Sequence, residues 1–186
     1  MWKKLFEILI IVGILLSITT TVYPWDGERK GFILGGGLGF GITSYKDTLW
    51  EGDERQTKGT LMTDFKIGYA KNNQVAFYFT NKTSWFSRDF ETTGISSNER
   101  ILSALTGGGI TYFVNPSARS LFVSGGFGVL SWSADMTTSH NGAGFFVGGG
   151  YEFAKYFNAE FNLIYGQPYN PNTVLTFMVT INVLGY

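Results

Sequence analysis

The side chains in this sequence that could support acid–base or nucleophilic chemistry are a single histidine and a small set of carboxylates and lysines. His140 lies in Ser139-His140-Asn141-Gly142, where the Asn-Gly pair is typical of a tight turn. A nucleophile needs a base within hydrogen-bond reach, and the base needs an orienting partner, neither of which this segment supplies. We therefore interpret His140 as a solvated loop residue and expect no enzymatic activity.

Glu152 and Glu160 invite another interpretation, a pair of carboxylates that performs acid–base catalysis. The alternation of the surrounding residues places both on the inner side of the sheet predicted below, where Asp64, Lys66 and Lys82 are also expected. Buried charges persist when they are paired. The five residues are therefore predicted to form an interior polar cluster, and catalysis is the less favoured alternative.

Metal and phosphate sites find no support in the sequence. The chain has no cysteine, which excludes disulfides and thiolate metal ligands. Glycines crowd residues 35–41, but the run lacks the G-x-G-x-x-G spacing, and no Gly-Lys dipeptide occurs in the chain. We predict no cofactor and no metal ion.

The elements that must position these residues are strands. About eight runs of alternating character are separated by connections that are alternately very short and longer. The short ones lie at 71–73, 115–118 and 154–155, and the longer ones lie near 45–58, 87–98, 133–142 and 167–172. Outer-membrane barrels have tight periplasmic turns and longer outer loops. The spacing therefore predicts an all-β fold, an eight-stranded antiparallel up-and-down transmembrane β-barrel.

The two faces of these runs are inverted relative to a soluble protein. In the seventh run Phe157, Phe161 and Tyr165 share one face, opposite Asn158 and Glu160. An apolar outer face fits lipid, where strands must also close into a barrel because an open edge would leave backbone amides unpaired. Seven of the eight runs can be given an outward face in this way, whereas the run 99–113 is ambiguous.

Two further patterns concern the ends of the predicted barrel. Tyr186 lies in the opposite phase to the outward residues of the last run, so we expect a bulge at Leu184-Gly185 that turns its ring outward; without a bulge the ring would plug the barrel. Aromatic residues near the predicted strand ends are interpreted as girdles at the membrane interfaces: Tyr45, Trp50, Trp85, Phe86, Tyr112, Trp132, Tyr156 and Tyr165.

The first residues have the order of a secretory signal. Lys3 and Lys4 precede an apolar segment at 8–16 and a small polar run at 17–21. Because this segment is shorter than the ~20 residues of a spanning helix, a cleaved signal is favoured over an uncleaved anchor or a buried helix. We predict a signal peptide at 1–22 and a barrel at 23–186, with 23–30 as a polar lead-in. Removing Lys3, Lys4 and Glu7 leaves 12 basic and 13 acidic side chains, a charge that gives no case for nucleic acid.

Two segments, FVGGGYEF at 146–153 and AEFNLIYG at 159–166, resemble the penultimate hairpin of small outer-membrane barrels of the OmpA-like and opacity-protein type. Glycine clusters at 35–37, 107–109 and 125–126 are similar to the same superfamily. The resemblance implies the outer membrane of a Gram-negative-type bacterium, with outer-membrane lipid, lipopolysaccharide and the barrel-assembly machinery as partners. Related barrels include lipid A deacylases with a His-x-Ser arrangement, but no serine follows His140 at that spacing.

We predict an integral outer-membrane barrel, a monomer, with a structural or surface-interaction role through its extracellular loops. A narrow conduit or binder for small or hydrophobic solutes is one alternative, and a lipid A-modifying enzyme is another. A secreted soluble barrel with an apolar cavity is disfavoured by the polar face opposite the apolar one. Side chains fill a barrel of this strand number, which disfavours an open pore.

Overall fold

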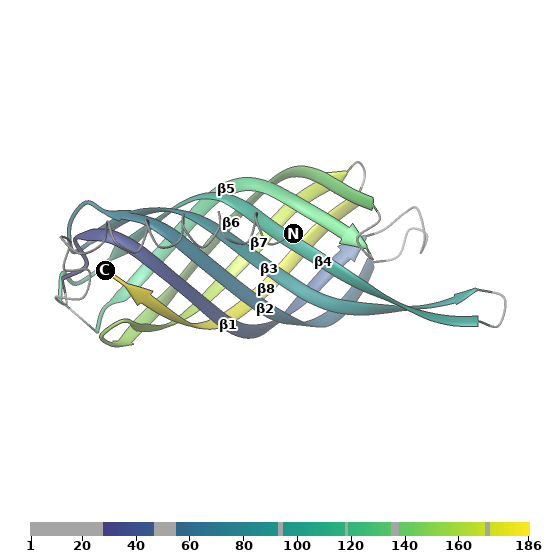
Figure 1. The fold of residues 1–186 in the computed structure, drawn as a ribbon, viewed down its shortest axis with the longest axis horizontal. Helices are drawn as coiled ribbons and strands as arrows, with labels where there is room; N and C mark the ends of the chain where they lie inside the picture. Colours follow the sequence, from purple (N-terminus) through teal and green to yellow (C-terminus); the bar gives the residue numbers. More distant parts are fainter. Residues whose placement is uncertain (1–27, 47–54, 93–94, 118, 135–137, 170–171) are drawn as a thin grey trace, which may run out of the picture.

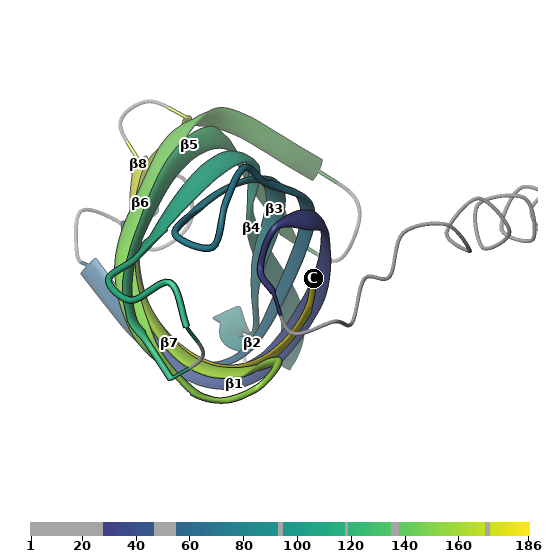
Figure 2. The same cartoon turned by 90° about the vertical axis from the view of Figure 1, so that its left-hand side faces the viewer.

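A computed structural model describes residues 28–46, 55–92, 95–117, 119–134, 138–169 and 172–186 of the chain. Eight antiparallel strands form a closed barrel in sequence order, which confirms the predicted fold (Figures 1 and 2). The strands are β1 (Gly31–Lys46), β2 (Arg55–Ala70), β3 (Val75–Thr92), β4 (Ile95–Phe113), β5 (Leu121–Ala134), β6 (Thr138–Ala154), β7 (Phe157–Tyr169) and β8 (Asn172–Gly185). Within these ranges no helix has the length and apolar content needed to span a membrane.

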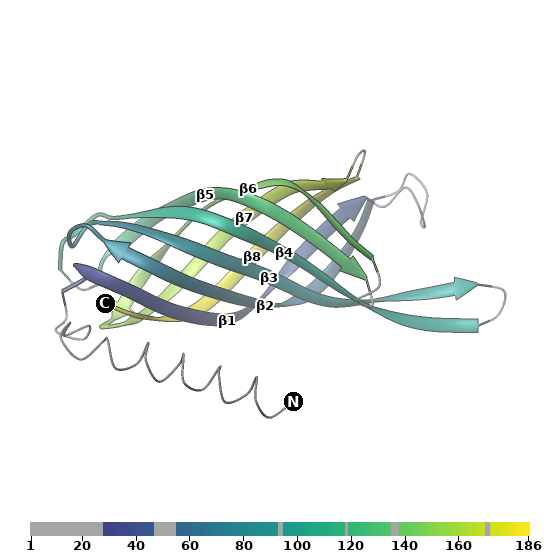
Figure 3. The ribbon, with the colours of Figure 1, turned by 45° about the horizontal axis from the view of Figure 1, so that its top comes forward.

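Closure of the barrel depends on the seam between the first and last strands. β1 pairs with β8 from Leu34 opposite Gly185 to Tyr45 opposite Val174. The start of β1 and the C-terminus therefore lie at the same end, together with the short turns, and we call this the lower end (Figures 1 and 3). The predicted signal peptide at 1–22 lies outside the described residues and stays a prediction.

The side chains alternate across the wall as the sequence predicts. Phe40 on β1 is 74% exposed, whereas Met62 and Met178 are fully buried inside the barrel. The strand whose facing the sequence left open is β4, where Leu105 points inward and Tyr112 points outward. The sequence could not distinguish the two faces of β4 because apolar side chains occur on both. The inner ones pack in the lumen, and the outer ones face lipid.

The predicted aromatic girdle is only partly correct. Trp85, Tyr112 and Tyr165 are exposed on the outer wall. Tyr45, Phe86 and Trp132 instead point into the barrel and are buried, while Tyr156 packs against the buried residues of the lower end. Trp50 lies outside the described residues. Distance from a strand end fixes a residue's height in the barrel, whereas the side of the wall depends on its phase.

The predicted bulge at Leu184-Gly185 is wrong. β8 keeps a regular register with β1 through Gly185, and the described register shifts occur instead between Glu152 and Ala154 and between Gly166 and Tyr169. Tyr186 is buried inside the lower end, with its ring 6.5 Å from that of Phe113. Interior contacts hold the ring there, so it closes the lower end of the lumen and does not reach the membrane–water interface.

β3 and β4 are longer than the other strands. β2 pairs with β3 only as far as Trp85, and β5 pairs with β4 only from Ile101. Beyond these points residues 87–92 of β3 and 95–100 of β4 pair with each other, and we call this hairpin the outer ribbon. It projects past the ends of the other strands on the side opposite the lower end (Figures 1 and 3).

The outward phase of β7 can be tested at Phe161, which is exposed on the wall. Replacing Phe161 by Arg should destabilise the folded barrel by about 2–4 kcal/mol in a bilayer, because a charge then faces hydrocarbon. Urea unfolding in lipid vesicles measures the loss, and Phe161→Leu is the matched apolar control. Equal stability of the two variants would show that this face of β7 does not contact lipid.

Candidate functional site

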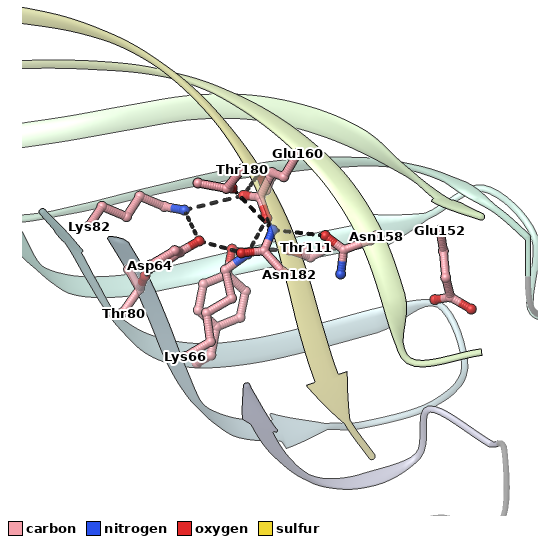
Figure 4. Close-up of polar contacts among 12 residues, drawn as sticks. Asp64, Lys66, Thr80, Lys82, Thr111, Glu152, Asn158, Glu160, Thr180 and Asn182 are labelled. Atoms are coloured by element: carbon pink, nitrogen blue, oxygen red, sulfur yellow. Dashed lines mark hydrogen bonds and ion pairs between the residues drawn. The ribbon is translucent and has the colours of Figure 1, made fainter. Parts of the chain in front are cut away.

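Four charged side chains meet in the middle of the lumen, and we call them the central network: Asp64, Lys66, Lys82 and Glu160 (Figure 4). The Lys82 ammonium lies 2.7 Å from Asp64 Oδ2 and 3.2 Å from Glu160 Oε1. Lys66 also pairs with both carboxylates, at 3.3 Å from Asp64 Oδ2 and in direct contact with Glu160 Oε2. Each lysine therefore bridges the same two carboxylates, and the four charges sum to zero.

The strands position this network across the width of the barrel. Asp64 and Lys82 are directly opposite each other on the neighbouring strands β2 and β3. Glu160 comes from β7 on the far wall, so its contacts with the two lysines span the lumen (Figure 4). Charges buried in this way are stable only when they are paired and hydrogen-bonded, and a network that joins opposite walls also blocks the passage between them.

Neutral groups complete the surroundings of the network. Thr80 donates a hydrogen bond of 3.1 Å to Asp64, and Asn182 approaches Glu160 Oε2 at 3.5 Å. Lys82 lies over the ring of Phe146, with 4.9 Å between Nζ and the ring centroid. The barrel wall therefore adds a neutral hydrogen-bond donor to each carboxylate and an aromatic ring to Lys82.

The lumen is closed above and below the central network as well. Above it Tyr45, Phe86 and Trp132 form an upper aromatic cluster, with ring centroids 5.0–5.8 Å apart. Below it Phe113 and Phe122, whose ring centroids are 5.3 Å apart, pack with Tyr186. The cavity between the network and this lower cluster measures about 10 Å³, room for about one water molecule.

This arrangement argues against acid–base chemistry at the predicted carboxylates. Glu160 and Asp64 are each committed to two lysines, and the adjoining cavity cannot hold a substrate. Among the described residues, moreover, no group of three His, Asp or Glu side chains is placed to bind a metal ion. The central network acts as a structural bridge across the lumen.

Glu152, the fifth residue of the predicted cluster, does not join the other four. It lies nearer the lower end, apart from the network (Figure 4), and pairs there with Arg29 at 2.9 Å. The hydroxyl of Tyr186 also approaches Glu152 Oε2, at 3.4 Å. Strand phase placed Glu152 inside correctly, but Glu160 lies opposite Gly150 in the β6–β7 register, two residues above Glu152, and the Glu152 carboxylate is held at the lower end by Arg29.

Arg29 is the functional residue that sequence reasoning missed. Its guanidinium donates hydrogen bonds to the carbonyls of Asn73, Asn115 and Ser117 at 2.6–2.8 Å, besides its pair with Glu152. The backbone of the next residues turns into β1 at Gly31, whose φ of 126° is a conformation that residues with a side chain rarely adopt.

The Arg29 contacts tie the predicted polar lead-in to two lower turns and to β6. Arg29 is buried, and its guanidinium stacks over Phe113 at 4.1 Å from the ring centroid. An arginine in a polar segment gave no signal of this role, because its partners are backbone carbonyls of turns that are distant in sequence. The Arg29 contacts close the lower end around the residues that precede β1.

His140 lies at the opposite end, near the start of β6. Its ring stacks on that of Tyr169, with 4.3 Å between the centroids. It is half-buried on the rim of the barrel, in a strand and not in the expected loop. The stacking gives the ring a packing role.

The closed eight-stranded barrel with an apolar outer wall and a charged, filled lumen defines an outer-membrane type of barrel. The chain is similar to the solved structure of Ail, the attachment invasion locus protein of Yersinia pestis, with a TM-score of 0.56 and 16% identity over 83% of this chain and 99% of that one. It is also similar to Neisserial surface protein A, with a TM-score of 0.55 and 13% identity over 84% and 97% of the two chains. No protein-family model and no curated protein sequence matches the chain.

These similarities show the fold, and the apolar outer wall shows that the barrel lies in a membrane. Together they confirm the predicted class, a small eight-stranded outer-membrane barrel, and its predicted location in the outer membrane of a Gram-negative-type bacterium. The role of the barrel at that location is a separate question.

The central network can be tested by unbalancing its charges. Lys82→Met should destabilise the barrel by about 3–5 kcal/mol, because Asp64 and Glu160 then share one cation in the dry interior. Combining Lys82→Met with Asp64→Asn restores neutrality and should recover a large part of this loss. Urea unfolding of both single variants and the double variant gives the coupling energy, and additive losses would contradict the network.

The Arg29 contacts predict a second stability effect. Arg29→Ala should lower the urea midpoint and Arg29→Lys should recover little of it, because a lysine cannot reach three carbonyls and a carboxylate at once. Lys30→Ala, at an exposed neighbouring position, is the control and should leave the midpoint unchanged. An Arg29→Ala barrel as stable as the control would show that the lower end closes without Arg29.

Proposed function

We propose that this barrel is a surface-interaction protein of the outer membrane, and that its outer ribbon contacts a protein partner outside the cell. The proposal rests on a contrast between the lumen of the barrel and the outer ribbon. The described lumen is filled from the upper aromatic cluster to Tyr186, whereas β3 and β4 continue past their neighbours as a free-standing hairpin.

The outer ribbon has the backbone geometry that protein recognition uses. Both of its edges adjoin no further strand of the described chain. The edge of a hairpin presents backbone donors and acceptors that an extended segment of another protein can pair with. A lipid or a small solute would not use such an edge.

The charge of the outer connections favours a protein over a polyanion. The four segments at the outer end of the barrel, residues 46–58, 88–100 (which include the outer ribbon), 133–142 and 167–172, contain eight acidic and five basic side chains, a net charge of −3. The last two segments lie largely within strands β5 to β8 and not in the longer connections that the sequence predicted. Ail has been solved with a heparin analogue, sucrose octasulfate. An acidic outer surface repels such ligands. A polyanion is therefore a less favoured ligand of this chain than a protein.

The remaining alternatives have less support. A conduit would need a path through the central network, whose ion pairs join opposite walls. An enzyme would need a base with partners, whereas His140 stacks on Tyr169. Outer-membrane lipid, lipopolysaccharide and the barrel-assembly machinery remain the partners that we propose for the wall and for its insertion.

Shortening the outer ribbon tests the proposal. Arg88 and Glu99 are directly opposite each other, so replacing 89–98 by Asn-Gly should give a regular two-residue hairpin turn. Cells that express this variant should lose attachment to serum-coated wells. Folding of the variant is checked on a gel, where a folded barrel migrates differently before and after boiling. Replacing 135–137 by Asn-Gly between Ala134 and Thr138, another opposite pair, is the matched control and should retain attachment.

Three outcomes would contradict the proposed function. Attachment that survives the shortened ribbon would remove the ribbon from recognition, and attachment to heparin-coated wells alone would indicate a polyanion ligand. Swelling of barrel-containing liposomes in arabinose would indicate a conduit.

A further inference from the structure

The outer wall carries a hollow over β2 to β6. Gly108 on β4 faces outward, with Phe79 of β3 opposite it on one side and Phe127 of β5 opposite it on the other. Gly125, also outward, lies beside Ile110 one step lower on the same two strands. The absence of side chains at these two glycines deepens a broad, open hollow, which measures about 970 Å³ between apolar and aromatic residues.

The floor of the hollow is a thin and firmly packed part of the wall. On its inner side Gly109 allows the rings of Tyr78 and Phe146 to approach closely: a Cβ at this position would lie 2.7 Å from Tyr78 and 2.9 Å from Phe146. Both rings are buried in the lumen. The hollow is therefore a fixed feature of the wall, supported from inside.

A protruding side chain stands at the rim of the same hollow. Phe127 is 78% exposed, the highest value among the large apolar side chains in the described part of the chain. A knob beside a hole makes a surface self-complementary, because a twofold axis places the knob of each copy in the hole of the other. Glycines at such a contact allow two backbones in a membrane to approach closely.

A row of polar side chains runs along the wall directly above the hollow. Asn81 and Thr106, opposite each other on β3 and β4, are joined by a hydrogen bond of 2.7 Å, and Thr83 donates another of 2.7 Å to Asn81. Asn81 and Thr106 are half-buried on the outer face, where lipid tails offer no hydrogen bonds, whereas Thr83 is covered by its neighbours. The Asn81 amide has two N–H donors, and one of them donates to Thr106. A protein partner could accept a hydrogen bond from the polar row, whereas an acyl chain has no acceptor.

The opposite wall lacks this combination. Leu38 and Phe40 on β1 and Val179 and Ile181 on β8 are all exposed and apolar, as contact with lipid requires. The hollow, the knob and the polar row therefore distinguish one side of the barrel.

We propose that this side is a self-association face. Two copies of the chain, inserted in the same orientation, pair through it about a twofold axis perpendicular to the membrane. The polar row of each copy lies along the contact, and Phe127 of each copy enters the hollow of the other. The sequence alone predicted a monomer. The face is separate from the outer ribbon, so the proposed function and this pairing can fail independently.

The test uses the absence of cysteine from the chain. Val129 is adjacent to Thr106 at the proposed contact and is 50% exposed, while Val179 on the opposite wall is 54% exposed. In lipid vesicles, Val129→Cys should give a cross-linked dimer with a short bis-maleimide, and Val179→Cys should give none.

A second pair of variants tests the hollow. A Cβ at Gly108 would meet no atom within 4 Å, so Gly108→Leu should fold, and its side chain occupies the floor of the hollow where the partner's Phe127 would enter. Gly36→Leu on β1 is the matched control, since the nearest atom to its Cβ is at 3.5 Å. Gly108→Leu should weaken dimerisation in vesicles about tenfold, Gly36→Leu should leave it unchanged, and the gel shift on boiling confirms folding of both.

Three results would overturn the proposal. They are equal cross-linking of the two cysteine variants, equal dimerisation of the two leucine variants, and a wild-type barrel that stays monomeric at every ratio of protein to lipid. If native mass spectrometry of that monomer shows a retained lipid that Gly108→Leu removes, the hollow binds an acyl chain and the pairing is wrong.

Discussion

The requirement that lipid imposes on the backbone underlies the rest of this structure. Hydrocarbon cannot replace a missing hydrogen bond, so every strand must have a neighbour on both sides within the bilayer. The seam between β1 and β8 meets this requirement by closing the sheet. Closure with eight strands then fixes a narrow lumen that side chains fill, and it directs the alternate residues of every strand to lipid.

The filled lumen carries a balanced set of charges. Two lysines and two carboxylates cancel in the central network, and Arg29 cancels Glu152 at the lower end. Ion pairs of this kind contribute less to net stability than apolar packing would, but removing one partner is costly. Their effect is therefore to hold opposite walls, the residues that precede β1 and the lower turns in one arrangement.

The features available for interaction are concentrated on β3 and β4. Above the membrane these two strands form the outer ribbon, and within it they carry the polar row and one side of the hollow. A barrel paired through this side would bring two ribbons near one another, so that a partner could engage both. The β1–β8 side offers lipid a regular apolar surface.

The sequence by itself determined the number of strands, their order and most of their facing, because the two-residue period of a strand is a local property. It placed Asp64, Lys66, Lys82, Glu152 and Glu160 inside the barrel. Only the tertiary structure determined that Glu152 pairs with Arg29, that Tyr45, Phe86 and Trp132 close the lumen, and that Tyr186 lies inside.

The partners depended on the tertiary structure because they are set by register and closure. Lys82 and Glu160 are 78 residues apart in sequence and meet only because the curved sheet brings β3 and β7 to face each other. The hollow likewise exists because the β4–β5 register places Gly125 one step below Gly108, beside Phe127. Register is a sum of hydrogen bonds and contacts along whole strands, and no single strand contains that information.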